Sequence, residues 1–260
     1  MRRLDGIVKP FILPGVFLNP AGILFCLAAA MATVLGGFLV TAAGKRYQSS
    51  VKYFMAVGAG FLLSLVFVEV VPTTFQTLGE SFALWFLGGY LVIHLVERAW
   101  VSHFHFGEEV HPEKIWLAGA PASAGLALHS FFDGVSIAAA THYSLLLGAL
   151  MFVAISLHKL PEGFTVASLN LAAGHSEKRA LGWAGVLGLA TMLGMFVSGL
   201  LYEFRVPLLA FSGGVALYVA ATDLVPEVNR ERGAKVPILV FAGVLLFYLT
   251  EQLLHHWLEV

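Results

Sequence analysis

Residues 145–171 read LLLGALMFVAISLHKLPEGFTVASLNL, an apolar stretch that carries His158, Lys159 and Glu162 near its centre. About 20 such residues in an α-helix cross the roughly 30 Å of hydrocarbon in a bilayer. The stretch is continuously apolar, whereas a transmembrane strand would alternate apolar and polar residues. The pattern therefore predicts a membrane-spanning helix with ionisable side chains deep in the membrane.

Seven further apolar runs accompany this one, so the chain is predicted to be an all-α polytopic membrane protein with eight transmembrane helices. The eight runs cover residues 21–43, 52–71, 82–100, 115–140, 145–171, 181–202, 208–225 and 236–257. Turn residues separate them, for example Pro72-Thr73-Thr74 and Gly174-His175-Ser176. We expect a single transmembrane domain over residues 1–260, with no separate soluble domain.

The composition points to the lipid bilayer as solvent and excludes several other classes of protein. Hydrophobic residues make up 58% of the 260 residues and charged residues only 12%, too few to coat a water-facing surface. The net charge is -1 and no basic run is present, so a nucleic-acid partner is not expected. Cys26 is the single cysteine, which excludes an intramolecular disulfide and a zinc site built from cysteines.

The distribution of lysine and arginine predicts the orientation of the helices. Ten of these residues lie in or beside the breaks after the first, third, fifth and seventh runs, whereas Arg205 alone lies in the other breaks. Cytoplasmic loops carry the excess of positive charge, so both termini are expected outside. The membrane is expected to be the plasma (inner) membrane. The N-terminal residues Arg2, Arg3 and Lys9 run against this orientation.

Two His-x-x-x-acid pairs lie in adjacent predicted helices, and they are the strongest indication of function. His129 and Asp133 are four residues apart, as are His158 and Glu162, so each pair lies on one helix face. A carboxylate at the centre of a bilayer costs about 2.5–3.5 kcal/mol on insertion scales. Two imidazoles and two carboxylates suit Zn²⁺ or Fe²⁺, whereas Ca²⁺ prefers oxygen ligands only. A purely structural role remains the alternative.

An internal similarity relates the second and seventh runs. Gly60, Glu69 and Pro72 align without gaps to Gly214, Asp223 and Pro226. The predicted orientation places the two acid-x-x-Pro ends at opposite membrane faces, as an inverted repeat requires. The acids of these ends are candidates to line a cation pathway or, alternatively, to cap helix ends; they are Glu69, Asp223 and Glu227.

Other ionisable groups give weaker indications. The loop 101–114 contains His103, His105 and His111 among glutamates, which fits either weak metal binding or a solvated polar loop. His94 with Glu97, and Glu251 with His255 and His256, lie towards helix ends. For these two groups an ordinary polar contact is the default expectation.

The two pairs and the eight runs together resemble the ZIP family of divalent-metal transporters. HSFFDG (129–134) looks like the family's His-Asn/Ser-x-x-Asp/Glu-Gly motif, and HKLPEG (158–163) looks like its His-x-x-Pro-Glu-Gly motif. The resemblance implies that the first three and last three helices form inverted repeats around a central pair. It also implies that His129, Asp133, His158 and Glu162 form the primary transport site.

The sequence departs from many family members at two positions that help to build a second metal site. Ser130 stands where asparagine is common, and Lys159 stands where an acid is common. An ammonium group there would repel a second cation. The hypothesis is therefore a site for a single metal ion, with Lys159 in the place of the second.

The leading hypothesis is uptake of Zn²⁺ into the cytoplasm by alternating access, with Cd²⁺, Fe²⁺ and Mn²⁺ as further candidate substrates and no cofactor. The main rival is an intramembrane zinc-dependent hydrolase, because a metal ion held by histidines and acids can also activate water. Against this rival, the HExxH motif is absent and Ser130 is the only nearby hydroxyl. A second rival is a metal-sensing membrane protein. The sequence leaves a homodimer open.

Overall fold

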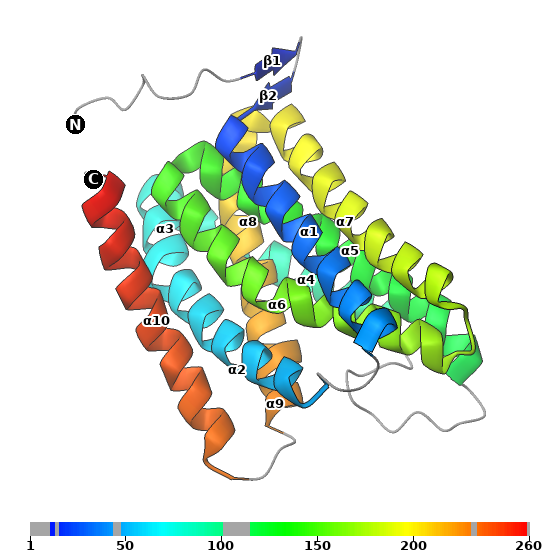
Figure 1. Ribbon diagram of the computed structural model, residues 1–260. Coiled ribbons are helices and arrows are strands. Elements are labelled where there is room, and N and C mark those ends of the chain that lie inside the picture. Colours follow the sequence, from blue (N-terminus) through cyan, green and yellow to red (C-terminus); the bar gives the residue numbers. More distant parts are fainter. Residues whose placement is uncertain (1–10, 14–15, 44–47, 101–114, 230–232, 259–260) are drawn as a thin grey trace.

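The computed structural model describes residues 11–13, 16–43, 48–100, 115–229 and 233–258, and this part of the chain is nearly all helical (Figure 1). The helices are α1 (Pro20–Ala43), α2 (Gln48–Ser64), α3 (Val71–Leu78), α4 (Phe82–Trp100), α5 (Ile115–Tyr143), α6 (Leu145–Ala172), α7 (Glu177–Leu200), α8 (Arg205–Tyr218), α9 (Val225–Val228) and α10 (Lys235–Leu258). Two π-helical segments, η2 (Leu65–Val70) and η6 (Val219–Leu224), join α2 to α3 and α8 to α9. Short 3₁₀ turns, η3 (Gly79–Ser81) and η5 (Tyr202–Phe204), precede α4 and α8.

Six segments of the described chain are long and apolar enough to cross a membrane. They are Pro20–Ala42, Lys52–Glu97, Leu145–Ala172, Glu177–Leu200, Tyr202–Leu224 and Lys235–Trp257. The second of these covers the apolar run 52–71 and most of the run 82–100, and α5 covers the run 115–140. A multi-pass, helical membrane protein is thus confirmed.

Both prolines predicted to end helices lie within helical segments, so the prediction of a break at Pro72-Thr73-Thr74 is wrong. Pro72 lies within a helix that runs without a break from α2 through η2 into α3, directly after the π-helical segment, where the Val71 N–H bonds to the Val66 carbonyl oxygen five residues back. The chain instead turns at Gly79, which has φ of 56°. Pro226 occupies the equivalent position in α9, directly after the π-helical segment η6.

A short hairpin at the N-terminal end is the one described exception to an all-α fold. Strands β1 (Phe11–Leu13) and β2 (Val16–Leu18) pair antiparallel. Phe17 packs against the rings of His142 and Tyr202, at centroid distances of 5.6 and 4.1 Å. The hairpin therefore contacts the C-terminal end of α5 and the turn η5 that follows α7.

The helices pack closely at glycines. A Cβ atom on Gly163 of α6 would overlap the carbonyl oxygen of Thr33 in α1, and one on Gly134 of α5 would overlap that of Thr191 in α7. Small residues allow such backbone approach in membrane proteins. The last glycine of each motif therefore lets α5 approach α7 and α6 approach α1.

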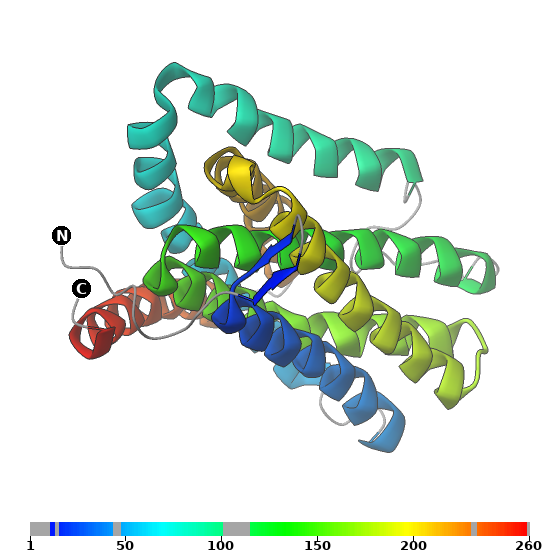
Figure 2. The same ribbon diagram turned by 90° about the horizontal axis from the view of Figure 1, so that it is seen from above.

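These contacts hold α1, α5, α6 and α7 together, with α5 and α6 as antiparallel neighbours (Figures 1 and 2). Helix α4 packs on α8, and α2 packs on α10. The paired predicted motifs therefore lie inside the bundle, on two helices that adjoin each other.

Candidate metal centre

Helices α5 and α6 present the two motifs to each other because a very short connection joins them. Helix α5 ends at Tyr143 and α6 begins at Leu145, and Ser144 between them accepts a hydrogen bond from the Leu147 N–H at 3.1 Å. A serine N-cap of this kind satisfies one of the free N–H groups of a helix start. The helices consequently run antiparallel, with His129 and His158 facing each other at a ring distance of 5.8 Å.

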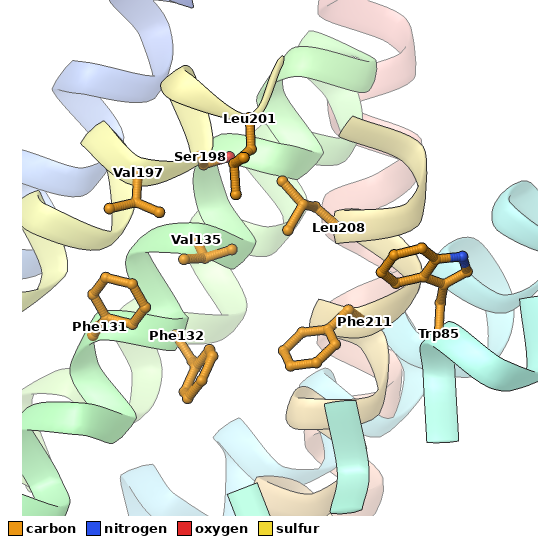
Figure 3. A pocket seen from close by; sticks show the side chains of 9 residues that line it. All are labelled: Trp85, Phe131, Phe132, Val135, Val197, Ser198, Leu201, Leu208 and Phe211. Carbon is orange, nitrogen blue, oxygen red and sulfur yellow. The ribbon is translucent and has the colours of Figure 1, made fainter. Parts of the chain in front are cut away.

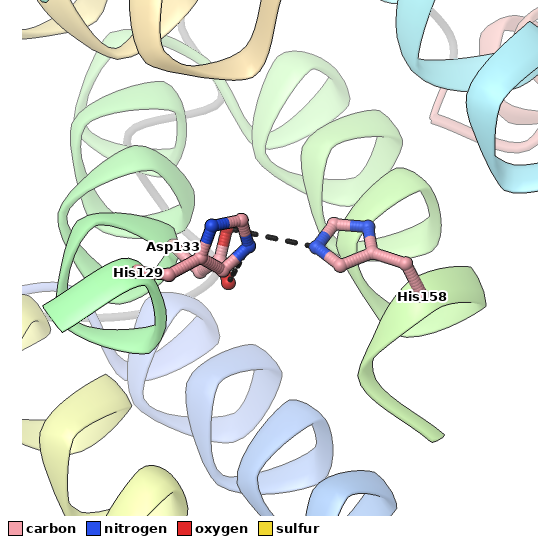
Figure 4. A group of neighbouring side chains, drawn as sticks. All are labelled: His129, Asp133 and His158. Carbon is pink, nitrogen blue, oxygen red and sulfur yellow. Dashed lines mark ion pairs between the residues drawn. The ribbon is translucent and has the colours of Figure 1, made fainter. Parts of the chain in front are cut away.

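His129, Asp133 and His158 form a buried triad of potential metal ligands (Figure 4). Asp133 lies between the histidines, with Oδ2 3.5 Å from His129 Nε2 and Oδ1 3.7 Å from His158 Nε2. These distances are too long for good hydrogen bonds. They are close to the roughly 3.4 Å that separates two ligands at about 2.05 Å from a tetrahedral Zn²⁺.

The hydrogen bond of His158 leaves its other nitrogen ready to bind a cation. Nδ1 lies 3.2 Å from the Ala154 carbonyl oxygen, which can only accept, so Nδ1 carries the proton. In the neutral ring Nε2 then has a free lone pair, and it has no hydrogen-bond partner although it is buried. Metal-binding histidines in proteins are commonly oriented in this way.

Lys159 forms an ion pair with Glu162, the fourth predicted ligand. Its Nζ is fully buried and lies 2.5 Å from Glu162 Oε2 and 2.7 Å from Asp133 Oδ2. It also donates to Ser130 Oγ at 2.7 Å, and that hydroxyl donates to Glu162 Oε1 at 2.6 Å. Of the four predicted ligands, the structure thus brings three together, and it pairs Glu162 with Lys159 and Ser130.

The opposite side of the same α5 turn is apolar. Phe131 and Phe132 line a cavity of about 240 Å³ together with Trp85, Leu208 and other apolar side chains of α4, α7 and α8 (Figure 3). The turn that contains the metal motif therefore has a polar face towards α6 and an apolar face towards its other neighbours.

A second group of potential ligands includes His129 as well. Glu97 on α4, His129 and Asp223 on η6 have ligand atoms that all lie within 4.8 Å of one another. Asp223 was predicted as a pathway residue, whereas Glu97 was expected to make an ordinary helix-end contact. No local spacing joins these residues along the chain, because they lie on three separate helical segments.

A pair of carboxyl groups lies on the segments η2 and α10, apart from the two groups of potential ligands described above. Glu69 on η2 and Glu251 on α10 lie close enough for their carboxyl groups to interact, and His255 lies nearby. Neighbouring carboxyl groups favour the binding of a cation between them. The side chain of Glu227 and the loop histidines His103, His105 and His111 lie outside the described part of the structure.

Comparison with known proteins gives several matches. Residues 107–245 match the family model of the ZIP zinc transporters. The chain is 33% identical to the zinc transporter ZIP9 of Micropogonias undulatus over 154 residues, which is 54% of this chain and 49% of the relative. It is 33% identical to ZIP9-A of Xenopus laevis, with 54% and 50% covered. It is 27% identical to the zinc transporter ZupT of Salmonella paratyphi A over 219 residues, with 78% and 85% covered.

The chain spans about half the length of the ZIP9 relatives and most of the length of ZupT. The family model covers more than half of the chain, including both His-x-x-x-acid motifs. On these grounds, and in agreement with the resemblance of its motifs, the chain belongs to the ZIP zinc transporter family.

Proposed function

We propose that this protein transports divalent metal cations, with Zn²⁺ as the main substrate, across a membrane and into the cytoplasm. The observation that carries the proposal is the triad of His129, Asp133 and His158, buried at the centre of a bundle of apolar helices. Ionisable side chains at such a depth usually serve a substrate or ion pathway. The relatives named zinc transporters support the same conclusion.

The donor atoms of the triad favour first-row metal ions as substrates. Two imidazole nitrogens and a carboxylate are suitable ligands for Zn²⁺, Fe²⁺ and Mn²⁺, and Cd²⁺ has similar preferences. Because Glu162 lies one helical turn beyond His158, it becomes a fourth ligand if its carboxylate leaves Lys159. The cation is the substrate here, and we propose no cofactor.

We further propose that a single cation occupies this centre at a time. Lys159 Nζ lies in a cage of oxygens from Ser130, Asp133 and Glu162, where a second cation would otherwise bind. Two unit charges about 4 Å apart repel each other by about 4 kcal/mol at an effective dielectric constant of 20. A divalent ion beside the ammonium group would be repelled more strongly.

We infer eight transmembrane helices arranged as two inverted repeats around α5 and α6, with both termini outside the plasma membrane. The π-helical segments support this, since η2 starts at residue 65 and η6 at residue 219, a shift of 154. The same shift relates Gly60 to Gly214 and Gly89 to Gly243. In each pair, added Cβ atoms would overlap equivalent carbonyl oxygens, for example those of Val240 and Phe86.

The same arrangement suggests where cations enter and leave. Glu69 lies on the segment η2, which runs towards the proposed outer face, and Asp223 lies on η6, which runs towards the proposed inner face. We propose Glu69 as an outer and Asp223 as an inner pathway residue, with Glu227 near the inner exit. The loop 101–114 remains a candidate for weak metal binding on the cytoplasmic side, and the protein is proposed to be one domain that forms a homodimer.

Family membership argues against the rival intramembrane hydrolase, because the relatives are transporters. The decisive experiment is uptake of Zn²⁺ by proteoliposomes that contain the purified protein. We expect saturable uptake by the native chain and a loss of at least about tenfold in His158→Ala and Glu162→Ala, which remove proposed ligands. His256→Ala, at an exposed position of α10, is the matched control. Binding of Zn²⁺ without any uptake would contradict the proposal and favour the hydrolase.

The outer pathway gives a separate prediction. Glu69→Gln and Glu251→Gln are expected to raise the KM of Zn²⁺ uptake several-fold and to change the maximal rate little, because fewer negative charges attract the cation to the entrance. Initial rates of uptake over a range of Zn²⁺ concentrations measure both constants. Glu80→Gln removes an exposed carboxylate from the same end of the protein and should leave KM unchanged. Equal effects of all three substitutions would argue against a specific entrance.

A further inference from the structure

The cavity beside the metal motif has an apolar wall (Figure 3). Eight of the nine side chains that line it are aliphatic or aromatic, and the ninth, Ser198, is buried. The cavity has a volume of about 240 Å³. An engineered cavity of about 150 Å³ with similar walls stays dry and binds benzene. This cavity therefore suits an apolar group of at least that size, and it does not suit a hydrated ion.

The cavity reaches the surface of the helix bundle. Trp85 and Leu201 line it and are 40% and 41% exposed, whereas Val135, which also lines it, is only 4% exposed. Trp85 belongs to a segment that is long and apolar enough to cross a membrane, and Leu201 lies between two more such segments. In a membrane-spanning bundle such a surface faces lipid. The phase that meets the mouth of the cavity is therefore the bilayer.

The depth of the cavity matches one leaflet of the bilayer. Helices α5 and α7 end side by side, since the rings of His142 and Tyr202 lie 5.2 Å apart. Leu201 lies at this end, whereas Phe132 lies about 16 Å along α5 from its last residue, Tyr143. One leaflet contributes about 15 Å of hydrocarbon. The cavity thus extends from the end of the helices to about the middle of the membrane, and the proposed orientation makes this the outer leaflet.

We propose that an acyl chain of a membrane lipid binds in this cavity, between α4, α5, α7 and α8. An acyl chain fits the apolar wall, the mouth in the bilayer and the depth of one leaflet. It supplies contacts that the wall of a void lacks, so it stabilises the packing of α5 against α4 and α8. Phe131 and Phe132 stand between His129 and Asp133 in the sequence, and the chain therefore supports the turn that carries these ligands. The site goes beyond the proposed transport function and does not depend on it.

The experiment is photolabelling of the full-length protein in nanodiscs of phosphatidylcholine that carries a diazirine within one acyl chain, with labelled residues identified by mass spectrometry. We expect label at the buried Val135 as well as at Leu193, which is 56% exposed on α7 and meets bulk lipid. Leu208→Trp enlarges a side chain that lines the cavity and should reduce the labelling of Val135 several-fold, because a filled interior has no room for the chain. Leu189→Trp, at a position that is 71% exposed, is the matched control and should leave both labels unchanged.

Unchanged labelling of Leu193 and native elution from a sizing column show that a variant is folded. Val135→Leu is a milder second variant that adds one methylene group to the wall, and its effect is read as a smaller loss of label at Phe132. Label at Leu193 without label at Val135 in the native protein, or equal labelling of Val135 in the native protein and Leu208→Trp, would overturn the lipid site. Labelling as expected in a protein that takes up no Zn²⁺ would instead overturn the transport function and leave the lipid site standing.

Discussion

Zn²⁺ binding is expected to rise from one to two ions per chain when Lys159 is replaced by methionine. Lys159→Met keeps most of the length of the side chain but empties the cage formed by Ser130, Asp133 and Glu162. The two carboxylates are then left at a buried position without an ammonium group. A second divalent cation restores the balance of charge, and the oxygens that now surround Nζ become its ligands.

Without metal, the same substitution is expected to destabilise the protein strongly. Removing one partner of a buried ion pair typically costs about 3–5 kcal/mol, because the remaining charge is left uncompensated. At about 2–4 °C per kcal/mol, this corresponds to a fall of roughly 10 °C in the melting temperature. Saturating Zn²⁺ should recover much of the loss, since a ligand at 1,000 times its Kd adds about 4 kcal/mol.

Melting curves with and without Zn²⁺, together with metal content after gel filtration, measure both effects. Lys178→Met replaces an exposed lysine at the start of α7 and should alter neither the stoichiometry nor the melting temperature. If Lys159→Met binds only one Zn²⁺ ion per chain, the ammonium group does not occupy the position of a second cation. Two ions bound to the native chain would lead to the same conclusion.

Hydropathy predicted most of the helices well because each has to match the thickness of the membrane. The apolar run 145–171 became α6, Leu145–Ala172, and the run 82–100 became α4, Phe82–Trp100. The π-helical segments and the helical prolines could not be predicted in this way. At Pro72 the local preference to end a helix is overridden, and the helix continues into α3 because the π-helical segment η2 directly before it shifts the hydrogen bonds of the helix.

The candidate site was predicted where it depends on spacing within a helix, and missed where it depends on packing between helices. The four-residue spacing placed His129 above Asp133 and His158 above Glu162. Lys159 and Glu162 are three residues apart, so their ion pair could also have been expected. Glu97 could have been found only through the repeat, since the shift of 154 residues relates it to Glu251, as it relates Asp223 to Glu69.

The second large effect is expected from a substitution at the contact between α5 and α7. A Cβ atom on Gly194 of α7 would overlap the carbonyl oxygen of Phe131, and one on Gly134 of α5 would overlap that of Thr191. Neither carbonyl can move aside as a flexible side chain does, because each belongs to a helix backbone. Phe131 lies between His129 and Asp133, so a shift of α5 at this contact also changes the distance between these two ligands and His158.

We therefore expect Gly194→Ala to lower the melting temperature and to reduce Zn²⁺ uptake by at least about tenfold. Overpacking a close contact typically costs about 1–3 kcal/mol, and here the overlap is with backbone. Gly185→Ala, in the same helix, places its methyl group where nothing lies within 4 Å and gains up to about 1 kcal/mol in helix propensity. The two substitutions add the same methyl group but should shift the melting temperature in opposite directions. Equal shifts would mean that α5 and α7 do not meet at Gly194, and the geometry inferred for His129 and Asp133 would then lose its support.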